Sequence, residues 1–254
     1  AWEVGFKGQA LDNRLTLSLA AFHAKYTNLQ VQATQQVNGA PLSIPTNAGS
    51  AVTKGIEIEF SYRPIEQLTF LGGVTYMKAR FDADGLPCQL AAQATAVTVP
   101  AGAATPTNSC YILSGSRVQD IRGGALPNSP NWKANGSIRY EDNLSSSLVG
   151  FVQINGNMQS RVLFDLNQDQ ELDQKGYATA DLSLGVKTAD DKYQLSFFIR
   201  NLTDKRYVSS KQRDNMLTNA ANPGNILFFT SKDASRYIGG TFRVSSACAL
   251  VAPC

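Results

Sequence analysis

The sequence has no long apolar run. Of its 254 residues, 43% are hydrophobic, but polar residues interrupt them everywhere, and no stretch approaches the roughly 18 consecutive apolar residues of a membrane-spanning helix. The first residues also lack the basic segment and the apolar segment of a secretory signal peptide. We interpret this start as lying inside a longer protein rather than as the product of signal removal.

Histidine is almost absent and cysteine is scarce. The single histidine, His23, would be the only base available to a Ser-His-Asp triad, and the four cysteines include no Cys-x-x-Cys pair. A structural zinc site needs about four nitrogen or sulfur ligands at short spacings, and these are missing. We therefore expect neither enzymatic activity nor a cofactor.

An excess of one charge is lacking as well. The chain carries 23 basic and 20 acidic residues, which gives a net charge of +3, and no run of lysine and arginine stands out. A nucleic-acid partner is therefore not expected.

The cysteines that are present suggest a disulfide. Cys88 and Cys110 flank a segment rich in alanine, threonine and proline that cannot build a core of its own. We expect them to be bonded, which implies an oxidising compartment; the alternative is two unpaired thiols in a loose loop. Cys248 and Cys254 are close enough to pair, but they belong to a terminal tail at 247–254, and whether they pair stays open.

The strongest pattern is alternation with a period of two. In "KGIEIEFSYRP" (54–64) apolar Ile56, Ile58 and Phe60 alternate with Glu57 and Glu59, which predicts a strand with one apolar and one polar face. The same pattern occurs at 131–141 and 177–187, with weaker copies at 2–8, 14–26, 68–81, 146–161, 193–203 and 236–246. The sequence therefore predicts an all-β protein of about nine strands.

Two aromatic residues break the alternation. Phe22 and Phe198 fall on the polar side of their strands, so each position predicts either a β-bulge or an aromatic ring that faces the polar side.

The connections between these strands alternate between short and long. Short polar turns lie at 9–13, 64–67, 141–144 and 188–192, and long connections lie at 27–51, 82–130, 162–176 and 208–235. Barrels of the bacterial outer membrane have short periplasmic turns and long extracellular loops, which favours an antiparallel transmembrane β-barrel with a long extracellular loop at 82–130. Aromatic residues near the ends of the apolar faces are typical of its interfacial girdles: Tyr62, Tyr76, Trp132, Tyr140, Tyr177 and Tyr193. A soluble β-sandwich is the alternative, because the inner faces of two sheets would give the same alternation.

Four segments resemble the C-terminal barrel of TonB-dependent outer-membrane receptors: "NAGSAVTKGIEIEFSYRP" (47–64), "PNSPNWKANGSIRY" (127–140), "FFIRNLTDKRYV" (197–208) and "SRYIGGTFRV" (235–244). The motif positions that carry this resemblance are Asn47, Gly49, Gly55, Asn201, Leu202, Asp204 and Tyr207. The resemblance implies a place in the bacterial outer membrane and energy-coupled uptake of a scarce nutrient of the siderophore, vitamin or saccharide class. A passive porin is the alternative function.

The resemblance also implies partners. Receptors of this family have a barrel of about 22 strands around an N-terminal plug, whereas this chain has nine predicted strands and no recognisable plug or TonB box. We therefore expect residues 1–246 to be the C-terminal part of such a barrel. Its expected partners are outer-membrane lipid, the plug and remaining strands, TonB acting through the N-terminal part, and a small nutrient ligand.

The polar faces supply the candidate site residues. We expect them to face the lumen and to contact water, the plug and passing ligand: Glu57, Glu59, Arg63, Lys133, Asn135, Arg139, Asp181 and Arg200. A weaker candidate is "DLNQDQELD", whose Asp165, Asn167 and Asp169 resemble the start of a calcium loop. The EF-hand pattern requires glycine and glutamate where this chain has Gln170 and Gly176, so we favour a solvated acidic loop tip.

Overall fold

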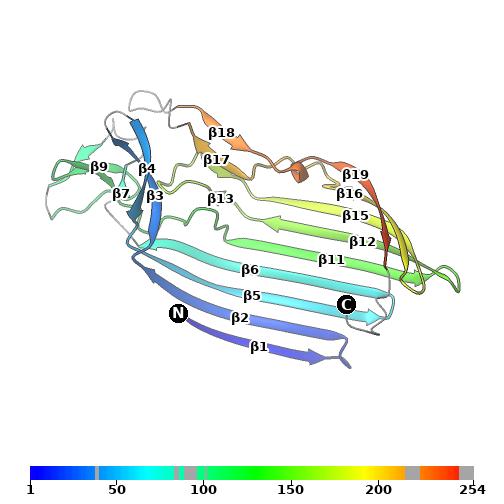
Figure 1. Cartoon of the computed structure of the whole chain (residues 1–254). Helices are drawn as coiled ribbons and strands as arrows, with labels where there is room; N and C mark the ends of the chain where they lie inside the picture. Colours follow the sequence, from blue (N-terminus) through cyan, green and yellow to red (C-terminus); the bar gives the residue numbers. More distant parts are fainter. Residues whose placement is uncertain (38–39, 83–85, 89–95, 101, 215–223, 246–254) are drawn as a thin grey trace, which may run out of the picture.

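The computed structural model describes residues 1–37, 40–82, 86–88, 96–100, 102–214 and 224–245 (Figure 1). Its main element is a nine-stranded sheet in the order β1-β2-β5-β6-β11-β12-β15-β16-β19, in which each strand pairs antiparallel with its neighbours. The strands are β1 (Trp2–Ala10), β2 (Leu15–Thr27), β5 (Ser50–Ile65), β6 (Leu68–Asp82), β11 (Trp132–Asn143), β12 (Leu148–Gln159), β15 (Tyr177–Thr188), β16 (Tyr193–Arg200) and β19 (Tyr237–Val244). The predicted all-β fold and its nine strands are confirmed.

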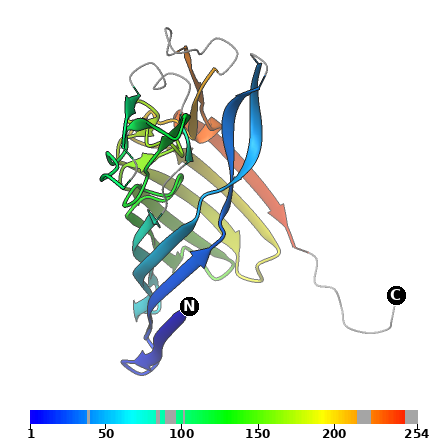
Figure 2. The ribbon, with the colours of Figure 1, turned by 90° about the vertical axis from the view of Figure 1, so that its left-hand side faces the viewer.

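The sheet is curved and open, with β1 and β19 at its two edges (Figures 1 and 2). The long connections gather at one end of the strands and the short turns at the other, as Figure 2 shows. Among the described residues, no helix is long and apolar enough to cross a membrane.

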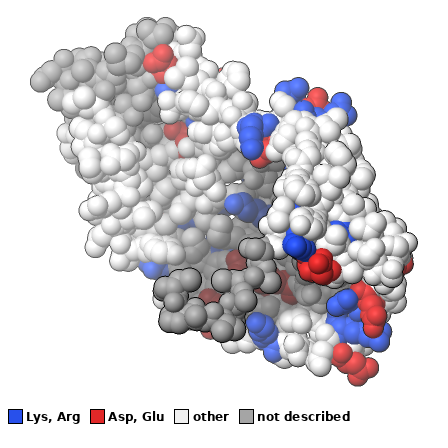
Figure 3. All heavy atoms as spheres, turned by 45° about the vertical axis from the view of Figure 1, so that its right-hand side comes forward, with Lys and Arg blue, Asp and Glu red and all other residues white. Residues whose placement is uncertain are grey.

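The apolar face of the sheet is uncovered. Register places Ile56, Val74 and Trp132 on one face with Ile154 and Leu184, and these side chains are 36 to 51% exposed. No second sheet packs against this face in the part of the chain that the structure describes. A β-sandwich would bury such a face against a partner sheet, so the sandwich alternative is wrong. Figure 3 shows small clusters of both charges separated by broad uncharged areas.

The two aromatic residues that break the alternation do not cause bulges. Phe22 pairs with Gly55, and Phe198 pairs with Gly239, without a shift of register. A Cβ atom added to Gly55 would lie 2.8 Å from the ring of Phe22, and one added to Gly239 would lie 2.5 Å from that of Phe198. Each ring therefore faces the polar side and covers a glycine of the next strand. A register shift occurs instead between Tyr62 and Ile65.

Two details of the predicted strands are wrong. The strand expected to run to residue 203 ends at Arg200, because Asn201 adopts a left-handed φ of 49°. Tyr177 is not part of the apolar face: it pairs with Gln159 and stacks on Tyr207, with 4.3 Å between ring centroids.

The long connections contain further strands. They are β3 (Gln30–Val37), β4 (Ala40–Asn47), β7 (Leu86–Pro87), β8 (Val97–Thr98), β9 (Cys110–Leu113), β10 (Ser116–Gln119), β13 (Val162–Leu163), β14 (Asp173–Gln174), β17 (Ser210–Arg213) and β18 (Ile226–Phe229). One 3-10 turn, η2 (Lys232–Ala234), precedes β19. A small core forms where the first two long connections meet the strand ends, from Ala48, Ala51, Phe81, Leu86 and Ile121.

The predicted disulfide is present. Cys88 and Cys110 are bonded, with 5.6 Å between their Cα atoms, and both side chains are buried. The bond joins the residue after β7 to the first residue of β9. Cys248, Cys254 and the predicted tail lie outside the described residues.

Candidate functional site

The candidate residues share one face of the sheet. Glu57 of β5 pairs with Thr75 of β6, which pairs in turn with Lys133 of β11. In the next row, Glu59 pairs with Gly73, which pairs with Asn135. The same face continues through Arg139, Asp181 and Arg200. Arg63 lies beyond these rows, where its guanidinium donates to the carbonyl oxygen of Glu66 at 2.6 and 3.0 Å. The structure thus divides the candidates into three groups along the strands.

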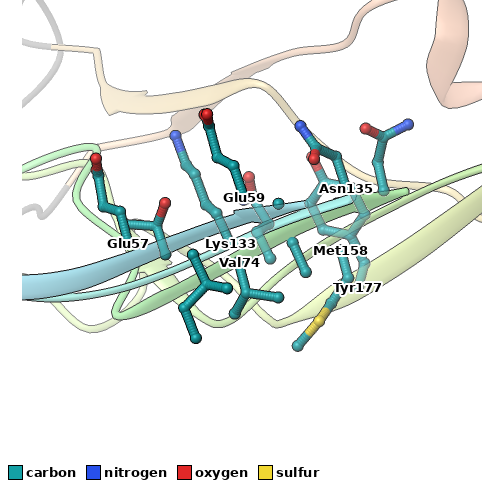
Figure 4. A pocket seen from close by; sticks show the side chains of 13 residues that line it. Glu57, Glu59, Val74, Lys133, Asn135, Met158 and Tyr177 are labelled. Carbon is teal, nitrogen blue, oxygen red and sulfur yellow. The ribbon is translucent and has the colours of Figure 1, made fainter. Parts of the chain in front are cut away.

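The first group surrounds a hollow of about 410 Å³ in the middle of the sheet. Glu57, Glu59, Lys133 and Asn135 point to the same side in Figure 4, away from Val74. The floor is low because Gly73 has no side chain.

Asn135 leans over this floor, since a Cβ atom on Gly73 would meet its Oδ1 at 2.9 Å. In the part of the chain that the structure describes, Glu57, Glu59 and Lys133 form no salt bridge. The hollow therefore offers two carboxylates, one ammonium group and an amide to a polar partner.

The second group lies near the short turns and is neutralised internally. The Nη2 atom of Arg139 lies 2.8 Å from Glu141, and Lys187 bridges Glu141 at 2.6 Å and Asp191 at 3.0 Å. The guanidinium of Arg139 also lies 4.0 Å above the ring of Phe151. The alternation assigns Glu141 and Lys187 to the polar face, but only the cross-strand register brings their charges together.

The third group lies next to the long connections. Arg200 and Asp181 form an ion pair at 2.8 Å, and the other carboxylate oxygen of Asp181 accepts the backbone N–H of Asn201 at 2.8 Å. Arg200 also lies 5.0 Å from the centroid of the Phe198 ring. These contacts fix the ends of β15 and β16 to each other.

Asn201, from the family motif, holds the chain where it leaves β16. Its side chain is buried, its Oδ1 accepts the N–H of Lys205 at 2.8 Å, and its Nδ2 donates to the carbonyl oxygens of Lys205 and Asp233 at 3.0 and 3.1 Å. The backbone N–H of Leu202 donates to Ala180 at 2.6 Å. Asn201 therefore joins the end of β16 to the segment before β19.

Asp204 and Tyr207 extend this junction. The Asp204 carboxylate accepts the N–H of Arg236 at 2.9 Å, and this bond lowers the pKa of Asp204. The ring of Tyr207 stacks on Tyr177, and burial raises the pKa of Tyr207. The motif "NLTDKRY" thus connects β15, β16 and β19 at the end of the sheet that carries the long connections.

The motif residues Asn47, Gly49 and Gly55 have local structural contacts. The Asn47 side chain accepts the N–H of Gly49 at 2.7 Å, and Gly49 has a φ of 72°, a conformation that glycine adopts without strain. Gly55 leaves room for Phe22 and approaches the carbonyl oxygen of Tyr76, which would lie 2.3 Å from an added Cβ atom. Asn47 and Gly49 therefore stabilise a turn, and Gly55 allows two strands to pack closely.

The segment at 165–169 is not the solvated loop tip that the sequence suggests. Asp165 accepts the N–H of Asp169 at 3.0 Å, and burial raises the pKa of Asp165. The Asn167 amide donates to Pro87 at 3.0 Å and to Gln119 at 2.8 Å. Within the described ranges, no group of three or more His, Cys, Asp or Glu side chains is arranged to hold a metal ion. The segment packs against the connection at 82–130, a long-range contact that local composition does not encode.

A comparison with known families decides the identity of the fold. Residues 1–202 match the family described as TonB dependent receptor-like, beta-barrel. The chain belongs to this family. Its relatives are receptors and transporters of the outer membrane of Gram-negative bacteria, so the chain is a segment of an outer-membrane β-barrel.

Individual relatives agree with this TonB-dependent receptor fold. The ferric yersiniabactin uptake receptor FyuA of Yersinia pestis superposes with a TM-score of 0.63 at 19% identity, covering 95% of this chain and 29% of that one. The siderophore receptor PiuA of Acinetobacter baumannii gives a TM-score of 0.58 at 19% identity, covering 95% and 28%.

The metal-pseudopaline receptor CntO of Pseudomonas aeruginosa is 32% identical over 83 residues, which are 33% of this chain and 11% of CntO. The matched regions therefore make up less than a third of the length of each of these relatives.

Proposed function

We propose that the protein carrying this chain is a receptor that takes up a scarce nutrient, a small metal chelate, across the outer membrane with energy supplied through TonB. The observation that carries the proposal is the hollow around Glu57, Glu59 and Lys133 on the polar face of the sheet, which we propose faces the interior of the barrel. Family membership adds the expectation of TonB coupling, and the names of FyuA, PiuA and CntO suggest a metal chelate.

The proposed receptor includes more than this sheet. In a bilayer, unpaired backbone groups at an open sheet edge cost several kcal/mol each, so we propose that further strands pair with β1 and β19. A plug domain inside the closed barrel would contact the polar face, and lipid would surround the apolar face. TonB would act through the N-terminal part of the receptor.

Uptake of radiolabelled ferric chelates by cells that produce the receptor tests the proposal. Accumulation in cells with TonB, and its loss in an otherwise identical strain without TonB, is the expected result. Equal uptake in both strains, together with entry of unrelated solutes of similar size, would instead indicate a passive porin. Binding of purified receptor to a panel of chelates would identify the ligand class.

A pair of variants tests the role of the hollow. Lys133→Gln removes the ammonium group from the hollow, and we expect slower uptake with an unchanged amount of folded receptor. Lys54→Gln is the matched control, because Lys54 is exposed on the opposite face of β5, the face that also carries Ile56. An equal effect of both substitutions would argue against a role for the polar hollow.

A further inference from the structure

The apolar face contains a groove near the short turns. It encloses about 370 Å³ and is lined mainly by Tyr140, Leu144, Val152, Leu184, Leu195 and Phe197. It lies beside Gly150, which pairs with Asp142 of β11 and with Val186 of β15. Leu144 closes one end, since it would lie 2.9 Å from a Cβ atom on Gly150. A hollow of this kind in a lipid-facing surface leaves room for an acyl chain, which gains dispersion contacts along its walls.

An acidic residue lies at the margin of this groove. Asp142 shares the apolar face with Tyr140 and Ile138, because alternate residues of a strand point to the same side. Its carboxylate accepts the Tyr140 hydroxyl at 3.0 Å and the N–H of Asn143 at 2.8 Å. Throughout the described ranges it has no salt bridge. On the opposite face at this end, Arg139 and Lys187 are paired with Glu141 and Asp191, two cations with two anions.

The position of Asp142 selects the chemistry of a ligand. Short turns of outer-membrane barrels lie on the periplasmic side, so Asp142 meets the headgroups of the inner leaflet. A carboxylate at that level attracts an ammonium group and repels the phosphate of an anionic headgroup. The exposed hydroxyls of Ser145 and Ser147 lie in the adjoining turn and can donate to a phosphate.

We propose that this groove is a binding site for one phospholipid with an ethanolamine headgroup. One acyl chain lies in the groove, and the ammonium group donates to the Asp142 carboxylate. This assignment goes beyond nutrient uptake and does not depend on the identity of the nutrient. It depends only on the apolar face contacting the inner leaflet.

Native mass spectrometry of the receptor that carries this sequence, titrated with defined phospholipids in detergent, tests the site. We expect phosphatidylethanolamine to be retained about five-fold better than phosphatidylglycerol, the effect of one exposed ion pair. Phosphatidylcholine should bind more weakly than phosphatidylethanolamine, because its ammonium group has no N–H donors. Equal retention of the three lipids by the native protein would overturn the proposal, and so would a preference for phosphatidylglycerol or lipid A.

Substitutions at Asp142 and at Gly150 test the headgroup contact and the groove separately. Asp142→Asn should abolish the preference for phosphatidylethanolamine, whereas Asp12→Asn, at an exposed acid in the turn between β1 and β2, should preserve it. Gly150→Phe should fill the groove and release all three lipids. Folding of each variant is checked by its migration in an unheated gel, and the lipid series on the native protein remains decisive if Gly150→Phe does not fold. A preference that persists in Asp142→Asn would refute the headgroup assignment.

Discussion

Arg213 of β17 lies 2.7 Å from the Asp169 carboxylate and 2.6 Å from that of Glu171, so the last long connection is fastened to the one before it. The Arg213 and Asp169 side chains are only 8 and 10% exposed. Lys211 adds a bond from its ammonium group to the carbonyl oxygen of Glu171 at 3.3 Å. These contacts therefore tie the two connections to each other.

Replacing Arg213 should release the last long connection. Arg213→Ala leaves Asp169 largely buried without its guanidinium partner, a loss that typically costs about 3–5 kcal/mol in a buried pair. We expect faster proteolysis and faster hydrogen exchange at 208–214 and 224–230, with little change in β15 and β16. Arg206→Ala is the control, because Arg206 is 70% exposed and its pair with Asp204 is long at 3.5 Å. Protection that is equal in the two variants would show that the Arg213 contact does not fasten the connection.

Gly55 should tolerate no side chain. In Gly55→Ala the new Cβ atom would lie 2.3 Å from the carbonyl oxygen of Tyr76 and 2.8 Å from the ring of Phe22, and such overpacking typically costs about 1–3 kcal/mol. The urea concentration at the midpoint of folding into bilayers should therefore be lower for Gly55→Ala than for the parent. Gly156→Ala should change stability little, since nothing lies within 4 Å of its added Cβ atom. Similar midpoints for the two variants would contradict the close approach at Gly55.

Charge on the apolar face should impair membrane folding. Ile58→Arg places a cation against lipid, at a cost of about 2–4 kcal/mol if the site lies near the bilayer midplane. Glu57→Gln, on the opposite face of the same strand, should fold normally. The measurement is the folded fraction after transfer of each variant into vesicles, and equal yields would show that the two faces are assigned wrongly.

Asn201 should be required for the junction between β16 and β19. Asn201→Ala removes three side-chain hydrogen bonds and leaves a residue with a Cβ atom at a φ of 49°. Loss of a buried hydrogen-bond partner costs about 1–3 kcal/mol, so thermal stability should fall. Asn201→Gly loses the same bonds but accepts the φ, and it should be the milder change. If both variants are as stable as the parent, Asn201 does not hold the junction.

The connection at 105–122 should loosen in acid. The Arg122 guanidinium beside Asp120 lowers the pKa of that carboxyl from 3.8 to about 2. Because the pKa is lower in the folded state, the stabilisation is complete above pH 3.8 and is lost as the pH falls through about 2. The protection factors of the amides at 105–122, corrected for the intrinsic pH dependence of exchange, should therefore fall across this window. In Asp120→Asn the protection should already be low at neutral pH and should vary little across the window.

The strands of the main sheet could be predicted from the sequence because apolar and polar residues alternate along each of them. The alternation of Ile56 and Glu57 predicts that they point to opposite faces of one strand, and the structure places them so. The disulfide was also predictable, since Cys88 and Cys110 bracket a segment without a core. The end of β16 was placed three residues too late, because the left-handed φ of Asn201 depends on its bonds to Lys205 and Asp233.

The long connections were not predictable to the same degree. Their strands are two to eight residues long, and their contacts join residues far apart in the chain, as when Asn167 reaches Pro87 and Gln119. Neither residue type nor spacing indicates such a pair. The acidic composition at 165–173 therefore suggested a solvated tip, although tertiary contacts bury much of it.

The small core under the long connections has a consequence for molecular recognition. Ala48, Ala51 and Ile121 are almost fully buried there, and the Gln168 amide joins the neighbouring connection to both backbone groups of Ala125. These segments lose their conformational freedom when the chain folds, before any ligand arrives. A ligand that meets them therefore encounters a preorganised surface and incurs a smaller entropic cost on binding.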